Sequence, residues 1–273
     1  RPTFLTAVPR IFEKIHAKIL DTVSSMTGVK KKLAEWSISV GLQTVPYRQR
    51  SQKLPFMLGF KYSIADKLVL NKFRAALGGK VRACSSGGSA LSKEVGSFFC
   101  GIGISIIEGY GLTETSPVMT IGHPDLFKFG TVGKAIPGVE VKIQPDGEIV
   151  CRGHNVMMGY YKNEEATNEA IIDGWFHSGD IGEFDEDGLL RITDRKKSLI
   201  VTSGGKNVAP QPMEVSLTSN KYIEQCNIVG DDRNFISALI VPSKENLLAW
   251  AEEQGLASLD YDALCAHDQT YEH

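Results

Sequence analysis

The residue types that could do chemistry are densest in residues 109–117, which read Gly-Tyr-Gly-Leu-Thr-Glu-Thr-Ser-Pro. The two glycines let the backbone turn sharply and approach a ligand closely, and Tyr110 offers a flat ring with a polar end. Thr113 and Glu114 place a hydroxyl beside a carboxylate, oxygen ligands that suit a magnesium ion also touching phosphate. A polar loop after a core strand is the simpler alternative for the glycines alone, but not for the whole string.

Two predicted strands would position such a site. The loop at 109–117 follows residues 104–107, whose β-branched side chains are typical of a buried parallel strand. In open α/β sheets, ligands bind beyond the carboxyl ends of strands. A second strand, 81–85, ends in Gly87, Gly88 and Ser89. About one βαβ unit separates the two loops, so neighbouring parallel strands would present both at one edge, although a tight helix start would also explain these glycines.

Composition limits the class of protein. The 273 residues are 42% hydrophobic and 23% charged, which suits one large domain, or a large and a small one, around a sizeable core. A net charge of −2 gives no general electrostatic case for binding nucleic acid. No apolar run reaches the length of a membrane span. Five widely spaced cysteines without a C-x-x-C pair favour a reducing cytoplasm over a zinc site or a disulfide framework.

Residues 1–79 are predicted to be helical. In the first helix, apolar residues recur at helical spacing: Val8, Ile11, Phe12, Ile15 and Ile19. Further helices are expected over 30–42 and 64–77. A basic cluster lies between them and comprises Lys30, Lys31, Lys32, Arg48, Arg50 and Lys53. Such a cluster is usually a solvated face; the alternative is peripheral contact with an anionic membrane on its cytoplasmic side.

After Thr131 the periodicity becomes that of strands. Residues 139–143 and 148–152 predict one antiparallel hairpin, and 182–184 with 189–192 predict another. Between the hairpins, Met157, Met158, Tyr160 and Tyr161 are predicted to pack in the core. The expected fold class is therefore α/β: a parallel α/β sheet portion with a β-subdomain, followed by a small α+β C-terminal domain.

The string from Gly109 to Thr115 resembles the signature of the adenylate-forming enzymes, the family of acyl-CoA synthetases, luciferases and peptide-synthetase adenylation domains. Residues 1–15 resemble a segment of long-chain acyl-CoA synthetases and are more specific to that branch. The resemblance runs from Arg1 to about Ala251. It implies an ATP-dependent long-chain fatty acid–CoA ligase, which forms an acyl-adenylate with release of pyrophosphate and then transfers the acyl group to coenzyme A.

The resemblance also implies roles for particular residues. Those expected to bind the nucleotide (ATP or AMP) are Gly87, Gly88, Ser89, Glu108, Gly109, Tyr110, Gly111, Leu112, Thr113, Asp180 and Arg195. Ser89-Ala90 stands where Ala-Pro is common in the family. Thr113 and Glu114 are the expected catalytic residues, with Glu114 as the ligand of Mg²⁺. His177 is expected to be structural.

The Asp-Arg-Lys-Lys string at 194–197 resembles the family's interdomain hinge, with Asp194 and Lys197 as hinge residues. Gly204, Gly205 and Lys206 then inherit the family's coenzyme A contact. The expected domains are 1–193, the C-terminal part of the large adenylate-forming domain, and 194–273, an incomplete small mobile domain.

Two elements of the family have no counterpart in this sequence. A phosphate-binding loop with its lysine is expected upstream of Arg1, and a C-terminal lysine is expected beyond His273. With a first residue that is not Met, this predicts an internal or C-terminal piece of an enzyme, inactive alone. The alternatives are an adenylating enzyme for another carboxylate and a non-catalytic nucleotide- or acyl-binding protein on the same scaffold. A dinucleotide-binding domain is weaker, because no G-x-G-x-x-G follows a strand.

Overall fold

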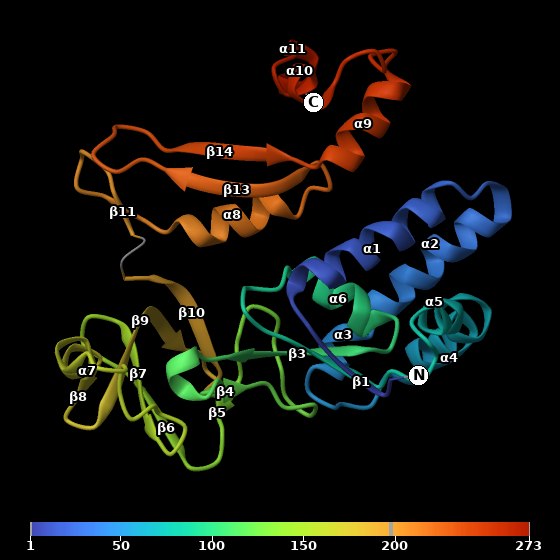
Figure 1. Cartoon of the computed structure of the whole chain (residues 1–273). Coiled ribbons are helices and arrows are strands. Elements are labelled where there is room, and N and C mark those ends of the chain that lie inside the picture. Colours follow the sequence, from blue (N-terminus) through green and yellow to red (C-terminus); the bar gives the residue numbers. More distant parts are fainter. Residues whose placement is uncertain (1, 197–198, 273) are drawn as a thin grey trace. The chain divides into compact units, whose positions relative to one another are not determined.

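The computed structural model describes residues 2–196 and 199–272 (Figure 1). The chain divides into two compact units, Arg1–Lys196 (unit 1) and Lys197–His273 (unit 2). Within the described residues, no helix is both long enough and apolar enough to cross a membrane.

The first sheet of unit 1 has the strand order β1-β2-β3-β4-β5. Its strands are β1 (Phe4–Ala7), β2 (Ala83–Ser86), β3 (Ser105–Tyr110), β4 (Thr120–Ile121) and β5 (Lys134–Ala135). β1, β2 and β3 are parallel neighbours, and β4 and β5 add antiparallel pairs. The expected parallel portion is confirmed. β1 corrects the prediction that residues 1–79 are helical. Its four residues pair with β2, which lies 79 residues further along the chain, so no local pattern in the sequence indicates this strand.

Helices cover this sheet and enclose its core. They are α1 (Pro9–Ser24), α2 (Gly28–Gln43), α3 (Val45–Arg48), α4 (Phe56–Ala65), the π-helix η1 (Asp66–Leu70), α5 (Asn71–Ala76) and α6 (Lys93–Gly101). Phe12, Leu70, Phe99, Ile104 and Ile106 form the centre of the core. Two expectations are wrong: the helix expected over 64–77 already begins at Phe56, and Val8 and Ile11 are exposed rather than on the buried face of α1.

The β-subdomain is a second, antiparallel sheet with the order β10-β9-β7-β6, and β8 pairs with β9. Its elements are β6 (Val139–Ile143), β7 (Glu148–Gly153), α7 (Glu164–Ala170), β8 (Ile171–Ile172), β9 (Trp175–Phe184) and β10 (Leu190–Arg195). Both predicted hairpins are confirmed. Tyr110 of β3 and Met119, which directly precedes β4, share one core with Ile149, Phe176 and Leu190 of this subdomain. The loop after β3 is therefore fixed where the two sheets meet.

The loop between β7 and α7 corrects a further expectation. Met157 is half-buried against the core, as predicted, but Met158 is 102% exposed, Tyr161 88% and Tyr160 39%. Of these four residues, Met157 alone packs against the core, because its backbone N–H donates to the carbonyl oxygen of Glu114 at 2.8 Å. The tyrosines follow in a loop that has left the sheet.

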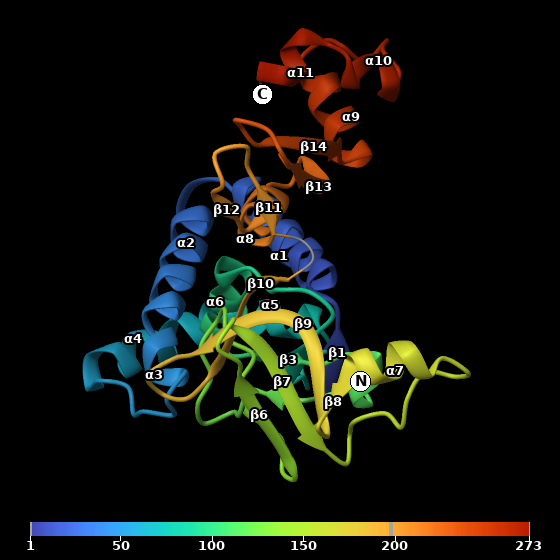
Figure 2. The same cartoon turned by 90° about the vertical axis from the view of Figure 1, so that its left-hand side faces the viewer.

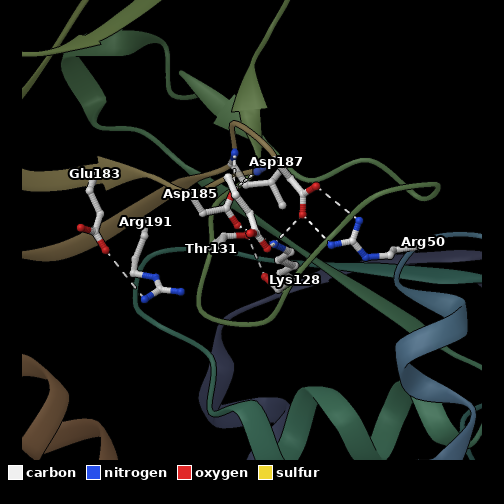
Figure 3. A network of polar contacts seen from close by, with 9 residues as sticks. Arg50, Lys128, Thr131, Glu183, Asp185, Asp187 and Arg191 are labelled. Atoms are coloured by element: carbon white, nitrogen blue, oxygen red, sulfur yellow. Dashed lines mark hydrogen bonds and ion pairs between the residues drawn. The ribbon is translucent and has the colours of Figure 1, made fainter.

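A charged network joins the β-subdomain to the helical side of unit 1 (Figure 3). Lys128 bonds Asp185 at 2.9 Å, and Arg50 makes two hydrogen bonds to Asp187, at 2.7 and 3.3 Å. Asp185 Oδ1 also accepts the backbone N–H groups of Asp187 and Leu189, each at 2.9 Å. The Asp185 carboxylate thus accepts two backbone N–H groups of the turn between β9 and β10 and also pairs with Lys128 from another segment.

Unit 2 is a small α+β unit, as expected. It contains β11 (Ile200–Val201), β12 (Asn207–Val208), α8 (Pro210–Thr218), β13 (Ile223–Val229), β14 (Ser237–Pro242), α9 (Lys244–Glu253), α10 (Tyr261–Cys265) and α11 (Asp268–Glu272). β13 and β14 form an antiparallel hairpin, and α8 lies along β13 (Figures 1 and 2). The two elements are linked where the Ile228 N–H donates to Glu214 Oε1 at 2.9 Å.

Candidate active site

Glycine shapes the loop after β3. A Cβ at Gly111 would lie 1.7 Å from the carbonyl oxygen of Pro117, so no other residue fits there. The next residues form a short 3₁₀-helix, η2 (Thr113–Thr115), where Thr115 Oγ1 accepts the Leu112 N–H at 2.9 Å. Thr113 is exposed and Glu114 is half-buried at the tip of this turn.

The second glycine loop lies beside the first. Gly87 follows β2, and a Cβ there would lie 3.7 Å from the carbonyl oxygen of Gly109. Gly88 has a φ of +87°, in the left-handed region that favours glycine, and Ser89 is exposed. Because β2 and β3 are parallel neighbours, both loops leave the same sheet edge.

Glu108 ties surrounding segments to β3 just before the loop. It is 7% exposed, and its two carboxylate oxygens accept the backbone N–H groups of Leu91 and Gly130, each at 3.2 Å. Burial raises the pKa of Glu108 to about 7, although these two hydrogen bonds act in the opposite direction. The group therefore titrates near neutral pH.

Tyr110, Asp180 and Arg195 meet from three strands. The Tyr110 hydroxyl donates to Asp180 Oδ2 at 2.6 Å, and Arg195 Nε donates to Asp180 Oδ1 at 3.1 Å. Arg195 stands directly opposite Asp180 in the ladder between β9 and β10. Asp180 is 5% exposed, whereas the Arg195 side chain is 68% exposed. Burial, and then the neighbouring Asp180, raise the pKa of Tyr110, so its hydroxyl remains a donor.

Glu114 has a partner that the sequence did not indicate. The Tyr160 hydroxyl donates to Glu114 Oε1 at 2.9 Å. The two residues are 46 positions apart, and Tyr160 was expected to be a core residue. No spacing rule links them, so only the fold could reveal this contact.

Comparison with known proteins gives the chain its family. The sequence profile of the AMP-binding enzyme family matches residues 1–161, and the profile of the AMP-binding enzyme C-terminal domain matches 197–260. The chain belongs to the AMP-binding enzymes. Its match to "Long-chain-fatty-acid--CoA ligase FadD15" of Mycobacterium bovis is 43% identical over 92% of this chain. Its match to "Long chain acyl-CoA synthetase 3" of Arabidopsis thaliana is 32% identical over 100% of the chain.

The chain spans 42% of the length of each of these two relatives. Among solved structures, it is similar to O-succinylbenzoate coenzyme A synthetase from Bacillus subtilis in complex with AMP, with a TM-score of 0.55 and 26% identity over 70% of this chain and 45% of that one. The adenylation domain of a carboxylate reductase from Mycobacterium chelonae has a TM-score of 0.61 and 21% identity over 96% of this chain and 37% of that one. The second likeness concerns the fold alone.

In this AMP-binding enzyme, an ionic cluster forms around the buried Glu148 close to the end of unit 1. Glu148 accepts the Gly179 N–H and contacts His177 Nδ1 at 3.0 Å and Lys196 Nζ at 3.1 Å. Burial alone would raise the pKa of Glu148, but these partners hold it below its usual value. His177 lines a pocket of about 660 Å³ on the β-subdomain, whose walls contain none of the residues expected to bind the nucleotide.

The remaining expected residues are divided between the two units. Asp194 is buried inside β10, where it pairs with Ile181, and Lys197 lies outside the described residues. Gly204, Gly205 and Lys206 form the exposed turn between β11 and β12 in unit 2. The Gly205 N–H donates to the carbonyl oxygen of Thr202 at 2.8 Å, and Gly205 has a φ of +75°.

Proposed function

We propose that the natural protein containing this chain is a long-chain fatty acid–CoA ligase that forms an acyl-adenylate and AMP. The observation that carries this is the meeting of Tyr110, Asp180 and Arg195 beside two glycine loops, in an AMP-binding enzyme whose relatives carry that name. ATP, coenzyme A and a fatty acid are the small-molecule substrates. The activation is needed because a carboxylate is a poor acyl donor, whereas its anhydride with AMP has a good leaving group.

The nucleotide would lie against the two loops. Asp180 and Arg195 would hold the ribose: the Tyr110 hydroxyl fixes the buried Asp180 carboxylate, and the Arg195 side chain, bonded to Asp180 through Nε, is otherwise exposed. The Tyr110 side chain packs in the core, so adenine would meet only the part of the ring that remains accessible. Gly87, Gly88 and Ser89 leave room for a planar base beside Gly109.

The residues present fit a magnesium ion held mainly by phosphate. Within the described residues, no group of three or more His, Cys, Asp or Glu side chains could hold a metal by itself. Mg²⁺ in nucleotide sites usually takes one or two carboxylates together with phosphate oxygens, and Glu114 beside Thr113 supplies one. When bound, the ion offsets phosphate charge. Glu114 orients it, and the exposed Thr113 hydroxyl can donate to a phosphate oxygen.

Substitution of the metal ligand tests the proposal. In the natural full-length protein, Glu114→Gln should slow fatty-acid-dependent pyrophosphate release by a factor of hundreds, about 3–4 kcal/mol, and weaken the response to added magnesium. Its melting temperature should change little, because the charge sits at a loop tip. Glu165→Gln, an exposed carboxylate on α7, is the matched control. If the wild type released pyrophosphate only with an aromatic or amino acid, the protein would be an adenylating enzyme for another carboxylate. If Glu114→Gln released pyrophosphate normally with an unchanged magnesium curve, Glu114 would not be a ligand of the metal.

The cysteines support a cytoplasmic location for this activity. All five are free, and Cys84, Cys100 and Cys151 are buried. Burial raises the pKa of each of these three thiols to about 11, so they are weak nucleophiles. We also propose that the protein associates peripherally with the cytoplasmic face of a membrane.

A further inference from the structure

The helix α4 lies at the periphery of unit 1 (Figures 1 and 2). A stripe of exposed apolar side chains runs along α4 and the following η1. The exposed fractions are 85% for Phe56, 61% for Met57, 59% for Phe60, 38% for Ile64 and 43% for Leu68. Four of the five follow one another at intervals of four residues, and side chains at that interval share one helix face. We call these five residues the outer stripe.

The opposite face of the same helices already packs into the core of unit 1. Ala65 and Leu70 are fully buried, and Leu58, Tyr62 and Phe73 are half-buried against the core. The outer stripe therefore lies outside the core of unit 1. A helix that is apolar on both faces has a second surface to cover.

The segment that carries the outer stripe is rich in positive charge. Residues 53–80 contain one acid, Asp66, in a chain of net charge −2, and their six cations are Lys53, Lys61, Lys67, Lys72, Arg74 and Lys80. The one acid is neutralised locally, because Arg74 Nη1 bonds Asp66 Oδ1 at 2.6 Å. The four lysines from Lys53 to Lys72 are exposed, and across residues 2–196 and 199–272 none of them forms an ion pair.

We propose that the outer stripe binds an anionic lipid surface, with its apolar side chains among the lipid headgroups and acyl chains and the flanking lysines on lipid phosphates. Apolar side chains bordered by lysines are the combination that holds a helix in a membrane interface. This proposal names the surface for the membrane association above and does not depend on the ligase activity. It keeps Lys53 from the basic cluster expected earlier but leaves out the two arginines, because Arg50 is paired with Asp187 and Arg48 lies over the Tyr62 ring at 4.7 Å.

Charge argues against a protein occupant. In a symmetric dimer the same patch of each copy meets its equivalent, so the unpaired lysines that flank the outer stripe of one copy would face those of the other. Protein interfaces are also depleted in lysine at their cores. An anionic bilayer offers acyl chains to the apolar residues and negatively charged phosphates to the lysines.

Flotation with lipid vesicles tests the proposal in the natural full-length protein. The wild type should float with vesicles containing about a third phosphatidylglycerol, bind pure phosphatidylcholine vesicles at least about tenfold less, and lose binding in about 0.5 M salt. Two double variants, Phe60→Ser with Ile64→Ser and Lys61→Glu with Lys67→Glu, should each lower binding about tenfold or more, without a fall in melting temperature.

Two matched controls change the same chemistry elsewhere in unit 1. Met158→Ser removes an exposed apolar side chain, Lys134→Glu reverses an exposed charge, and both should bind vesicles like the wild type. Absence of wild-type binding, or stripe variants that bind as well as the controls, would overturn the proposal. A wild-type dimer that Phe60→Ser converts to a monomer would assign the stripe to self-association, and a large fall in melting temperature would assign it to packing within the protein. Pyrophosphate release is measured separately, so failure of either proposal remains distinguishable.

Discussion

Tyr160 holds the Glu114 carboxylate through a single hydrogen bond, from its hydroxyl to Glu114 Oε1 at 2.9 Å. Burial and the adjacent carboxylate raise the pKa of Tyr160, which keeps the hydroxyl protonated at neutral pH. Tyr160→Phe removes only this oxygen. It should raise the magnesium concentration needed for half-maximal pyrophosphate release about fivefold, since a hydrogen bond that orients a charged group contributes about 1 kcal/mol.

Two measurements distinguish positioning from a general loss of structure. Binding of Mn²⁺ with AMP, followed by electron paramagnetic resonance, should weaken in Tyr160→Phe by a factor similar to the change in the magnesium curve. Tyr161→Phe is the control, since that ring is 88% exposed and has no contact with Glu114. If the two variants behaved alike, Tyr160 would have no role in the site.

Glu108 gives the fold a dependence on pH with a definite sign. Its pKa of about 7 in the fold lies above the ordinary 4.5, so the folded state binds the proton more tightly than the unfolded state. The resulting stabilisation is complete below the unfolded pKa and is lost as pH rises through about 7. A difference of this size corresponds to about 3 kcal/mol.

Glu108→Gln should abolish that loss, because it cannot ionise. Between pH 5 and pH 8, the urea-unfolding free energy of the wild type should fall by up to about 3 kcal/mol more than that of the variant. The variant itself should be somewhat less stable at pH 5, since an amide can accept from only one of the two N–H groups that bond Glu108. Parallel pH curves for the two proteins would show that Glu108 ionises normally in the fold.

Among the elements, the turn between β9 and β10 depends on one carboxylate. Asp185→Ala should lower the free energy of unfolding by about 1–3 kcal/mol, because the N–H groups of Asp187 and Leu189 lose their acceptor and Lys128 loses an ion-pair partner. Its neighbour Glu186 is the control: its side chain is 84% exposed, and Glu186→Ala should change stability by less than about 0.5 kcal/mol. Equal thermal shifts for both variants would contradict this account.

The sequence predicted elements best where a local pattern determines them. Alternation at 139–143 and the Asp-Gly turns led to the correct hairpins, and β-branched residues led to β3. β1 was missed because four residues carry no period of their own and are a strand only through pairing with β2. Tyr160 was misplaced because an aromatic side chain indicates burial in general, whereas here a loop directs its hydroxyl to Glu114.

The site residues were found by a different route. Spacing alone predicted that the loops after β2 and β3 would share an edge, which the pairing of these strands confirms. Spacing could not have predicted the contact between Tyr110 and Asp180, which are 70 residues apart. The expectation that both belong to the nucleotide site came from the family resemblance. Short-range patterns report local backbone conformation, whereas contacts between distant strands depend on how two sheets pack.

At the scale of the whole molecule, the division into units decides where motion is expected. The chain divides after Lys196, whereas Asp194 and Arg195 still belong to β10. Lys196 is held to unit 1 by Asp146 at 2.7 Å, by Glu148 at 3.1 Å and by its own N–H on the carbonyl oxygen of Gly179. We propose that these contacts hold the chain up to Lys196 as part of unit 1, so that Asp194 is not the hinge on which unit 2 turns. Bending at Asp194 would disrupt its pairing with Ile181.

Distances between spin labels test whether unit 2 moves as proposed in the natural full-length protein, with Cys226 and Cys265 replaced by serine. Labels on Lys134→Cys in unit 1 and Lys244→Cys in unit 2, both exposed positions, should give a broad or two-peaked distance distribution. Its weights should shift between samples with ATP and samples with AMP and coenzyme A, since a ligand that binds one arrangement more tightly raises the population of that arrangement. The matched pair Lys134→Cys with Lys93→Cys lies within unit 1 and should give one narrow distance in every state. A single narrow distance across the units, unchanged by any substrate, would mean that they act as one rigid body, and the hinge would have to be abandoned.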